Sequence, residues 1–240
     1  MRQRDSPFVS SLRRDGFGGC PAVFVLGVCM AKRSSVLRVV SADELRGALS
    51  RGFSAPIEPL TGVPVTCTDV RGLAERAHEQ GLAAVCDLSC VGRACAAVRL
   101  GADVAFAPAA GAGTMLVWVA RGEQGVADAA RGLLSAGRDA DDAELALLEQ
   151  RAHEWRASSD AAQVVASYLL CHPRVERVVY PGLRTDSSYD VASRTLENGF
   201  GPLVDARLVG EDSWRRLTCT SGDPLEQVGL LEERLRSDLA

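Results

Sequence analysis

Short apolar segments alternate with helical patterns and turn residues through the first half of the chain. Apolar runs of strand length cover residues 36–40, 82–86, 104–107 and 115–120. Short apolar runs set between helical patterns are typical of buried parallel strands. The alternation therefore predicts an α/β fold, in which a mostly parallel sheet is flanked by helices.

Two of the predicted helices have clear start and stop signals. Ser41 precedes a short helical pattern, and Glu44 follows three residues later, which is the spacing of a capping box. Thr68 or Asp69 begins a second helix. Gly81 ends that helix, because glycine is preferred just past a helix end.

The remaining elements follow from periodicity and from the position of glycine and proline. Near the start of the chain we expect a short strand at residues 8–10, a turn at 17–20 and an apolar core segment at 23–30. Later in the chain we expect a short helix over 93–100 and one long helix over 143–170 that joins two regions. Strands over 175–180 and 202–209 and a final helix over 225–237 follow. We expect a boundary near residue 157, with a large domain over 1–157 and a reduced α+β region over 158–240.

Composition narrows the class of protein. The chain has 240 residues, 47% of them hydrophobic and 24% charged, which is typical of a globular protein. The net charge of −4 gives no support for binding nucleic acid or an anionic membrane. The apolar run at residues 21–31 is too short to span a bilayer and lacks a small-residue cleavage site.

The eight cysteines form no CxxC pair, which argues against zinc, and no other metal motif is present. Several lie in apolar runs, where a free cysteine acts as a small buried hydrophobe. This usage indicates a reducing compartment, and we expect the cytoplasm.

The candidate chemistry lies where two predicted strands end. The first strand ends on Asp87, and the second runs into the turn Pro108–Gly111. In open α/β sheets, ligands bind beyond the carboxyl ends of the strands. From the pattern alone, the better interpretation of Asp87 is an ordinary turn or cap residue at the end of a strand.

Three blocks of sequence stand out in order along the chain: AHEQG…VCD…LGADV at residues 77–104, HPRVERVVYPGL at 172–183 and NGFG at 198–201. Together they resemble the Cys/Met-metabolism family of pyridoxal-phosphate (PLP) enzymes. This is the transsulfuration group of cystathionine γ-synthase, the cystathionine lyases, methionine γ-lyase and O-acetylhomoserine sulfhydrylase. The resemblance implies a type I aminotransferase-like fold and PLP as cofactor.

The resemblance also assigns site residues. Asp87 matches the aspartate that keeps the pyridine nitrogen protonated, and Phe17 matches the aromatic residue stacked on the ring. Ser89 joins them as a cofactor-binding candidate. Arg216 matches the arginine that grips the substrate carboxylate by a bidentate contact, although Arg215 leaves the register open by one residue.

Several family residues are replaced. The block that carries the Schiff-base lysine falls on Pro108–Gly111, so Gly111 stands at the lysine position and two hydroxyls are lost. Lys32, the only lysine, lies far upstream. Gly62 replaces an asparagine that contacts the ring, and the family's phosphate loop and N-terminal arm have no counterpart.

These losses predict a truncated, degenerate and non-catalytic homologue that docks, as a homo-oligomer or onto a full-length relative, in a structural or regulatory role. One alternative is a residual transsulfuration enzyme that binds PLP non-covalently. Another is a decayed reading frame without a selected function. The sequence leaves all three open.

Overall fold

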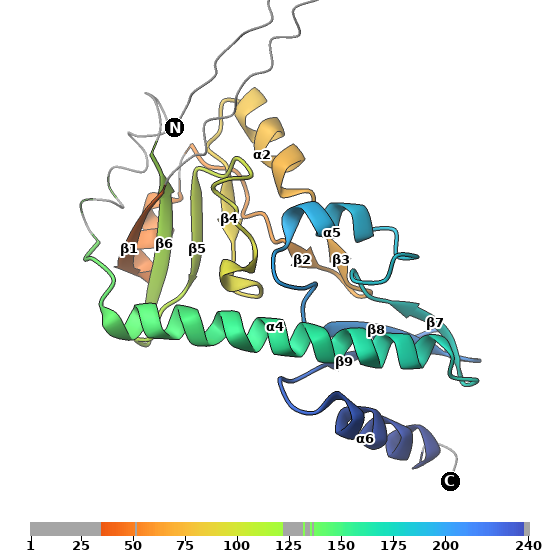
Figure 1. Ribbon diagram of the computed structural model, residues 1–240. Coiled ribbons are helices and arrows are strands. Elements are labelled where there is room, and N and C mark those ends of the chain that lie inside the picture. Colours follow the sequence, from red (N-terminus) through yellow and green to blue (C-terminus); the bar gives the residue numbers. More distant parts are fainter. Residues whose placement is uncertain (1–34, 51, 122–131, 133–134, 136, 238–240) are drawn as a thin grey trace, which may run out of the picture. The chain divides into compact units, whose positions relative to one another are not determined.

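The structure is a computed structural model, and it describes residues 35–50, 52–121, 132, 135 and 137–237. The elements predicted at residues 8–10, 17–20 and 23–30, and with them Phe17, lie outside the described residues. The described part of the chain between residue 35 and residue 237 carries two sheets of three or more strands and one long helix that packs on both (Figure 1).

The first sheet has four strands in the order β1-β6-β5-β4. Their bounds are β1 (Ser35–Ser41), β6 (Thr114–Ala120), β5 (Val104–Pro108) and β4 (Val85–Asp87). β4 and β5 are parallel, whereas β6 is antiparallel to β5 and to β1. Three of the four strands therefore point the same way, as predicted. Because the reversed β6 lies between β1 and β5, two of the three pairings are antiparallel, which the alternation pattern did not indicate.

The structure confirms the residues predicted to begin the first two helices and to end the second, with one choice resolved. α1 (Ala42–Ala48) begins with the capping box, in which Ser41 Oγ accepts from the Glu44 backbone N–H at 3.1 Å and the Glu44 carboxylate accepts from the Ser41 N–H at 2.8 Å. α2 (Val70–Glu79) has Asp69 as its N-cap rather than Thr68. Gly81 follows with a φ of +71°, in the left-handed region that glycine favours.

The predicted helix over residues 93–100 is wrong. That segment holds a single 3-10 turn, η1 (Gly92–Ala94), followed by irregular backbone. The segment is anchored by other parts of the chain: Cys95 forms an antiparallel bridge with Leu196, and the Glu197 N–H donates to the Ala94 carbonyl at 2.6 Å. Such long-range pairing cannot be read from local periodicity.

The second sheet is antiparallel, with three strands in the order β7-β8-β9. Its strands are β7 (Val175–Val179), β8 (Leu203–Leu208) and β9 (Arg215–Thr218). A hairpin of β2 (Leu60–Thr61) and β3 (Thr66–Cys67), α5 (Tyr189–Thr195) and α6 (Pro224–Ser237) complete the described elements.

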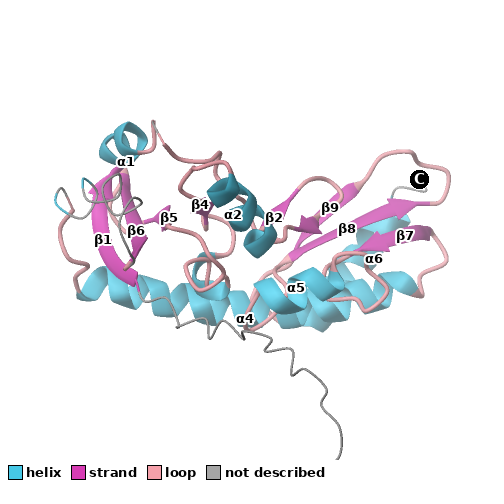
Figure 2. Ribbon diagram, turned by 90° about the horizontal axis from the view of Figure 1, so that it is seen from above, coloured by secondary structure: helices cyan, strands magenta, loops and turns pink. Residues whose placement is uncertain are grey.

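α4 (Asp142–Leu170) runs beside both sheets and contributes to both main hydrophobic cores (Figure 2). Trp155 packs in the core that lies against β4 and β5. Nearly two helical turns further along, Ala161 and Ala162 pack in the core formed with β8 and α6. α4 is continuous through residue 157, and the predicted division of the chain there stays a prediction.

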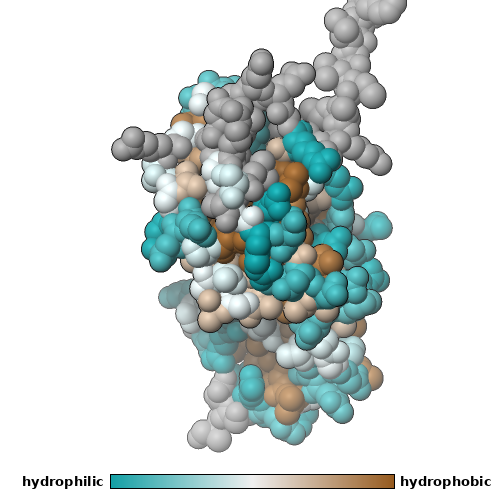
Figure 3. All heavy atoms as spheres, turned by 90° about the vertical axis from the view of Figure 1, so that its left-hand side faces the viewer, coloured by the Kyte–Doolittle hydropathy of each residue, from teal (hydrophilic) through white to brown (hydrophobic). Residues whose placement is uncertain are grey.

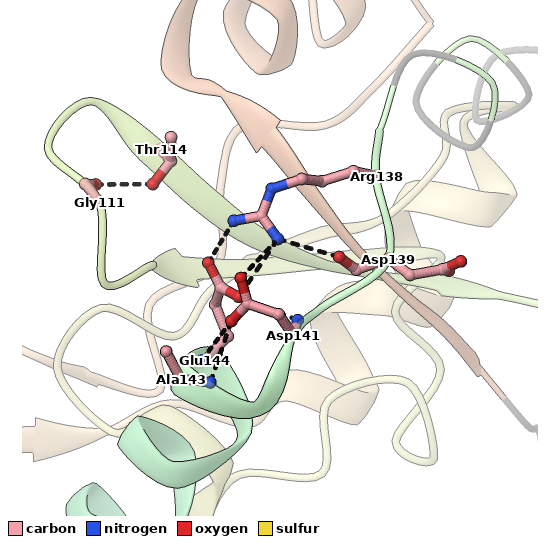
Figure 4. A network of polar contacts seen from close by, with 7 residues as sticks. All are labelled: Gly111, Thr114, Arg138, Asp139, Asp141, Ala143 and Glu144. Atoms are coloured by element: carbon pink, nitrogen blue, oxygen red, sulfur yellow. Dashed lines mark hydrogen bonds and ion pairs between the residues drawn. The ribbon is translucent and has the colours of Figure 1, made fainter.

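A polar network fixes the start of α4 (Figure 4). Asp141 caps the helix by accepting from the N–H groups of Ala143 and Glu144, at 3.0 and 3.1 Å. The Glu144 carboxylate in turn accepts a hydrogen bond from the Asp141 N–H at 3.0 Å and binds the Arg138 guanidinium. Only 3% of Glu144 is exposed. Arg138 is in turn held to β1 by two backbone hydrogen bonds with Val39, at 2.9 and 3.1 Å.

The Arg138 guanidinium, helped by the hydrogen bonds from Asp141, lowers the pKa of Glu144 to about 2 from the usual 4.5. A carboxyl group whose pKa is lowered by folding stabilises the protein above its unfolded pKa and loses that effect as the pH falls. We therefore expect Glu144→Gln to lower the Tm at pH 7 and to flatten the fall in Tm between about pH 4.5 and 2. Circular dichroism melts over this pH range would measure it.

Glu154→Gln is the matched control, because Glu154 lies on the exposed part of the same helix and its carboxylate accepts only from the Gln150 amide within the described chain. Its curve of Tm against pH should run parallel to that of the unmodified protein. If the Glu144→Gln curve did the same, the network would not be coupled to folding.

Candidate functional site

Asp87 lies at the carboxyl end of β4, as the sequence predicts. Its N–H donates to the Ile57 carbonyl at 2.9 Å, and it pairs with Phe106 of β5. Its carboxylate oxygen Oδ1 accepts from the Ser89 N–H at 2.8 Å, which closes a local turn. Oδ2 has no hydrogen bond to the residues that the structure describes. One oxygen therefore has a structural role, and the other is available.

Ser89 is exposed, and its contact with Asp87 is made by the backbone. Its hydroxyl makes no hydrogen bond within the described ranges. The structure thus brings Ser89 to Asp87 without engaging the side chain for which the sequence singled it out.

The turn after β5 is closed on itself. The Ala109 N–H donates to the Thr114 carbonyl at 3.0 Å, and the Thr114 hydroxyl donates to the Gly111 carbonyl at 2.6 Å (Figure 4). The Pro108 carbonyl accepts from Arg151 of α4 at 2.6 Å. Gly111 itself is exposed, and a Cβ added there would lie 3.0 Å from Thr114 Oγ1. A side chain at this position would therefore have to displace the Thr114 hydroxyl slightly.

Arg216 of β9 makes a bidentate pair with Asp205 of β8. Arg216 Nε lies 2.9 Å from Oδ1, and Nη2 lies 2.7 Å from Oδ2. Asp205 is fully buried, and its Oδ2 also accepts from the Val65 N–H at 2.5 Å. The hydrogen bond to Asp205 raises the pKa of Arg216, and the same guanidinium donates to the Gly62 carbonyl. The edge of Arg216 that suits a carboxylate is thus filled by a carboxylate of this chain.

Cys90 joins these groups, and sequence reasoning missed it. Cys90 is exposed, but partial desolvation by the atoms around it raises the pKa of its thiol. Arg216 opposes the rise, and the carboxylates of Glu58 and Asp87 add to it. These interactions place Asp87, Arg216, Cys90 and Glu58 in one neighbourhood. The available signals were the three-residue spacing of Cys90 from Asp87, and the position of Glu58 beside Ile57, which bridges to β4.

No group of histidine, cysteine or acidic side chains in the described ranges could hold a metal ion. The six cysteines that the structure describes are all free thiols, at positions 67, 86, 90, 95, 171 and 219. None of the helices in these same ranges combines the length and the apolar character needed to cross a bilayer.

Comparison with proteins of known structure gives relatives of one kind. The chain superposes on apo CalE6, a methionine gamma lyase from Micromonospora echinospora, with a TM-score of 0.53 and 19% identity, over 71% of this chain and 60% of that one. It superposes on cystathionine gamma synthase from Xanthomonas oryzae pv. oryzae, in complex with aminoacrylate and cysteine, with a TM-score of 0.50 and 26% identity. That match covers 71% of this chain and 46% of the other.

A segment of 49 residues is 37% identical to L-methionine gamma-lyase of Fusobacterium nucleatum subsp. nucleatum, which is 20% of this chain and 12% of that protein. The chain thus spans less than two thirds of the length of each of these relatives. Its α/β fold is that of the PLP-dependent type I enzymes. The model of the Cys/Met metabolism PLP-dependent enzymes matches residues 55–218, about two thirds of the sequence. The chain belongs to the Cys/Met metabolism PLP-dependent enzyme family.

Proposed function

We propose that this chain is a non-catalytic member of its family, which keeps the fold and serves as a structural or regulatory partner. The observation that carries the proposal is Gly111 in the turn after β5, where the resemblance places the Schiff-base lysine. Lys32, the one lysine of the sequence, is in a segment far upstream of that turn. An amine is required for covalent attachment of PLP, and the turn offers none.

Among the described residues, those of the turn after β5 do not fit the phosphate group of PLP. A phosphate cradle needs hydroxyls and free backbone N–H groups, usually at a helix N-terminus. The turn after β5 contains Pro108, which has no N–H, and the Ala109 N–H is already bonded to the Thr114 carbonyl. The Thr114 hydroxyl is bonded within the turn as well. We therefore derive no reaction step through the cofactor.

The pair of Arg216 and Asp205 supports the same proposal. A bidentate arginine can hold one carboxylate in its fork, and that place is taken by a buried aspartate. An incoming substrate carboxylate would have to displace Asp205 and leave its charge buried and unpaired, which is costly.

One observation favours the alternative of residual, non-covalent PLP binding. Asp87 Oδ2 is not bonded to any described residue and could accept from a protonated pyridine nitrogen. Such a contact and one ring contact together contribute on the order of a few kcal/mol, against an entropic cost of association that is at least comparable. We accordingly place this alternative second.

The substitution Gly111→Lys separates the two. If the amine alone were missing, it would restore a borohydride-reducible PLP adduct. We expect no adduct, because the phosphate cradle is absent and the new side chain meets the Thr114 hydroxyl. Mass spectrometry after borohydride reduction would measure the adduct at residue 111.

Ala110→Lys provides the control, because Ala110 is exposed and adjacent, and its lysine reports the reaction of an ordinary surface amine. The expected yield of adduct is equally low for both variants. Tight PLP binding by the Gly111→Lys protein alone, or turnover of cystathionine or a homoserine ester by the unmodified chain, would overturn the non-catalytic assignment.

The internal ion pair makes a second prediction. Asp205→Asn keeps an acceptor for the Val65 N–H but removes the charge, so we expect a loss of about 2 kcal/mol in the free energy of unfolding. Glu176→Gln is the matched control, because the pair of Arg207 and Glu176 at 2.8 Å joins two strands of the same sheet but is more exposed. It should cost less than about 1 kcal/mol. Urea titrations would compare the free energies of unfolding of the two variants. Equal losses would show that the buried pair of Asp205 and Arg216 stabilises the protein no more than an exposed pair does.

The partner role makes a third prediction. Figure 3 shows mostly hydrophilic residues on one side of the described chain, with hydrophobic ones in small separate areas. On α6, by contrast, Leu225 is 72% exposed and Leu230 58% exposed. These two leucines are apolar surface that association with a partner could cover. We expect light scattering to show species larger than the 25.4 kDa monomer, as self-association or as a complex with a full-length relative. A monomer at high concentration that also fails to bind such a relative would contradict this role.

A further inference from the structure

A hollow of about 370 Å³ opens on the face of the first sheet opposite to Asp87. Ala105 and Trp118 form its floor, and they are directly paired across β5 and β6. Asp87 pairs instead with Phe106, the next residue along β5, and side chains of successive strand residues point to opposite faces. The hollow is therefore separate from the neighbourhood of Asp87 and Arg216.

The apolar part of this hollow is lined by Leu88 and Val98 as well as by the floor. A second, more polar hollow of about 540 Å³ shares two lining residues with it, Arg93 and Glu197. The second hollow is bounded on its other side by α4, through Glu149, His153 and Trp155. The two together offer an apolar recess beside a charged entrance.

The wall between the two hollows is held by contacts from distant parts of the chain. The Trp155 indole N–H donates to the Glu197 carbonyl at 3.2 Å, and the Glu197 N–H donates to the Ala94 carbonyl at 2.6 Å. The Glu197 carboxylate pairs with Arg99. Because these bonds fix both edges, the recess is preformed in the fold, and a ligand would not have to order it.

The entrance carries opposite charges that the described chain leaves unused. Arg93 and Glu149 both line it and are exposed. Neither makes a hydrogen bond or ion pair with a residue in the described ranges. A small ligand with a carboxylate for Arg93 and an ammonium group for Glu149 would satisfy both, and an apolar side chain would fill the recess over Trp118.

We propose that these two adjoining hollows, which share the lining residues Arg93 and Glu197, together bind a free α-amino acid with an apolar side chain. Arg93 holds its carboxylate, Glu149 holds its ammonium group, and the recess over Ala105 and Trp118 takes the side chain. This site would let a non-catalytic chain respond to an amino acid. It uses neither the turn at Gly111 nor Arg216, so it stands or falls independently of the proposed function.

The test is calorimetric titration of the full chain with L-leucine, in the absence of PLP. We expect a Kd between about 10 μM and 1 mM, which is typical of a ligand of this size. Leucinamide, which lacks the carboxylate, and 4-methylpentanoic acid, which lacks the ammonium group, should each bind about tenfold or more weakly.

Arg93→Gln should weaken L-leucine binding about tenfold or more and leave leucinamide binding unchanged. Arg46→Gln is the control, because Arg46 is exposed on α1 and pairs only with Asp43 within the described chain. It should bind L-leucine as the unmodified protein does, and thermal melts would confirm that both variants are folded. No binding of L-leucine at 10 mM, equal binding of leucinamide by the unmodified protein, or full affinity in Arg93→Gln would each overturn the proposal.

Discussion

The buried carboxylate of Asp205 is the constraint on which the second half of the structure depends. A charge with no exposed surface has to be paired and hydrogen-bonded, because its desolvation is otherwise very costly. Asp205 meets this requirement with Arg216 from β9 and the N–H of Val65 from the β2–β3 turn. One side chain thereby fixes the hairpin, two strands of the second sheet and the direction of an arginine. The same contact that orders these elements also occupies the bidentate edge of the Arg216 guanidinium.

Residues of the sequence blocks that resemble the family make packing contacts in this structure. Tyr180, from the block ending in YPGL, is fully buried, and its hydroxyl lies 3.1 Å from the Ser159 carbonyl and 3.2 Å from the Gly201 carbonyl. Gly199 has a φ of +127°, and a Cβ there would lie 2.4 Å from Ser159 Cβ. Gly201 likewise leaves room for Trp155. These residues pack α4 against the chain that follows it, so their role here is structural.

Local rules predicted the elements whose signals are local, and the family register predicted where Asp87 would lie. The capping box at Ser41, the glycine stop at Gly81 and the position of Asp87 all follow from short-range patterns or that register. The irregular segment after η1 could not be predicted, because its conformation depends on pairing with Leu196, some hundred residues away. The pair of Asp205 and Arg216 was missed for a similar reason. Nothing within β8 alone indicates that its aspartate faces an arginine of the next strand.

Gly111 differs from Gly199, Gly201 and Asp205 in what a substitution would cost the fold. Gly199, Gly201 and Asp205 occupy places where a different side chain would clash or leave a buried group unpaired, so each change would cost stability. Gly111, by contrast, is exposed in a turn that closes through its backbone and Thr114. The turn closes without any side chain at residue 111, so glycine at this position leaves the turn intact. The proposed absence of the amine is therefore compatible with the fold, and other surfaces of that fold, such as the hollow at Arg93, remain available for binding.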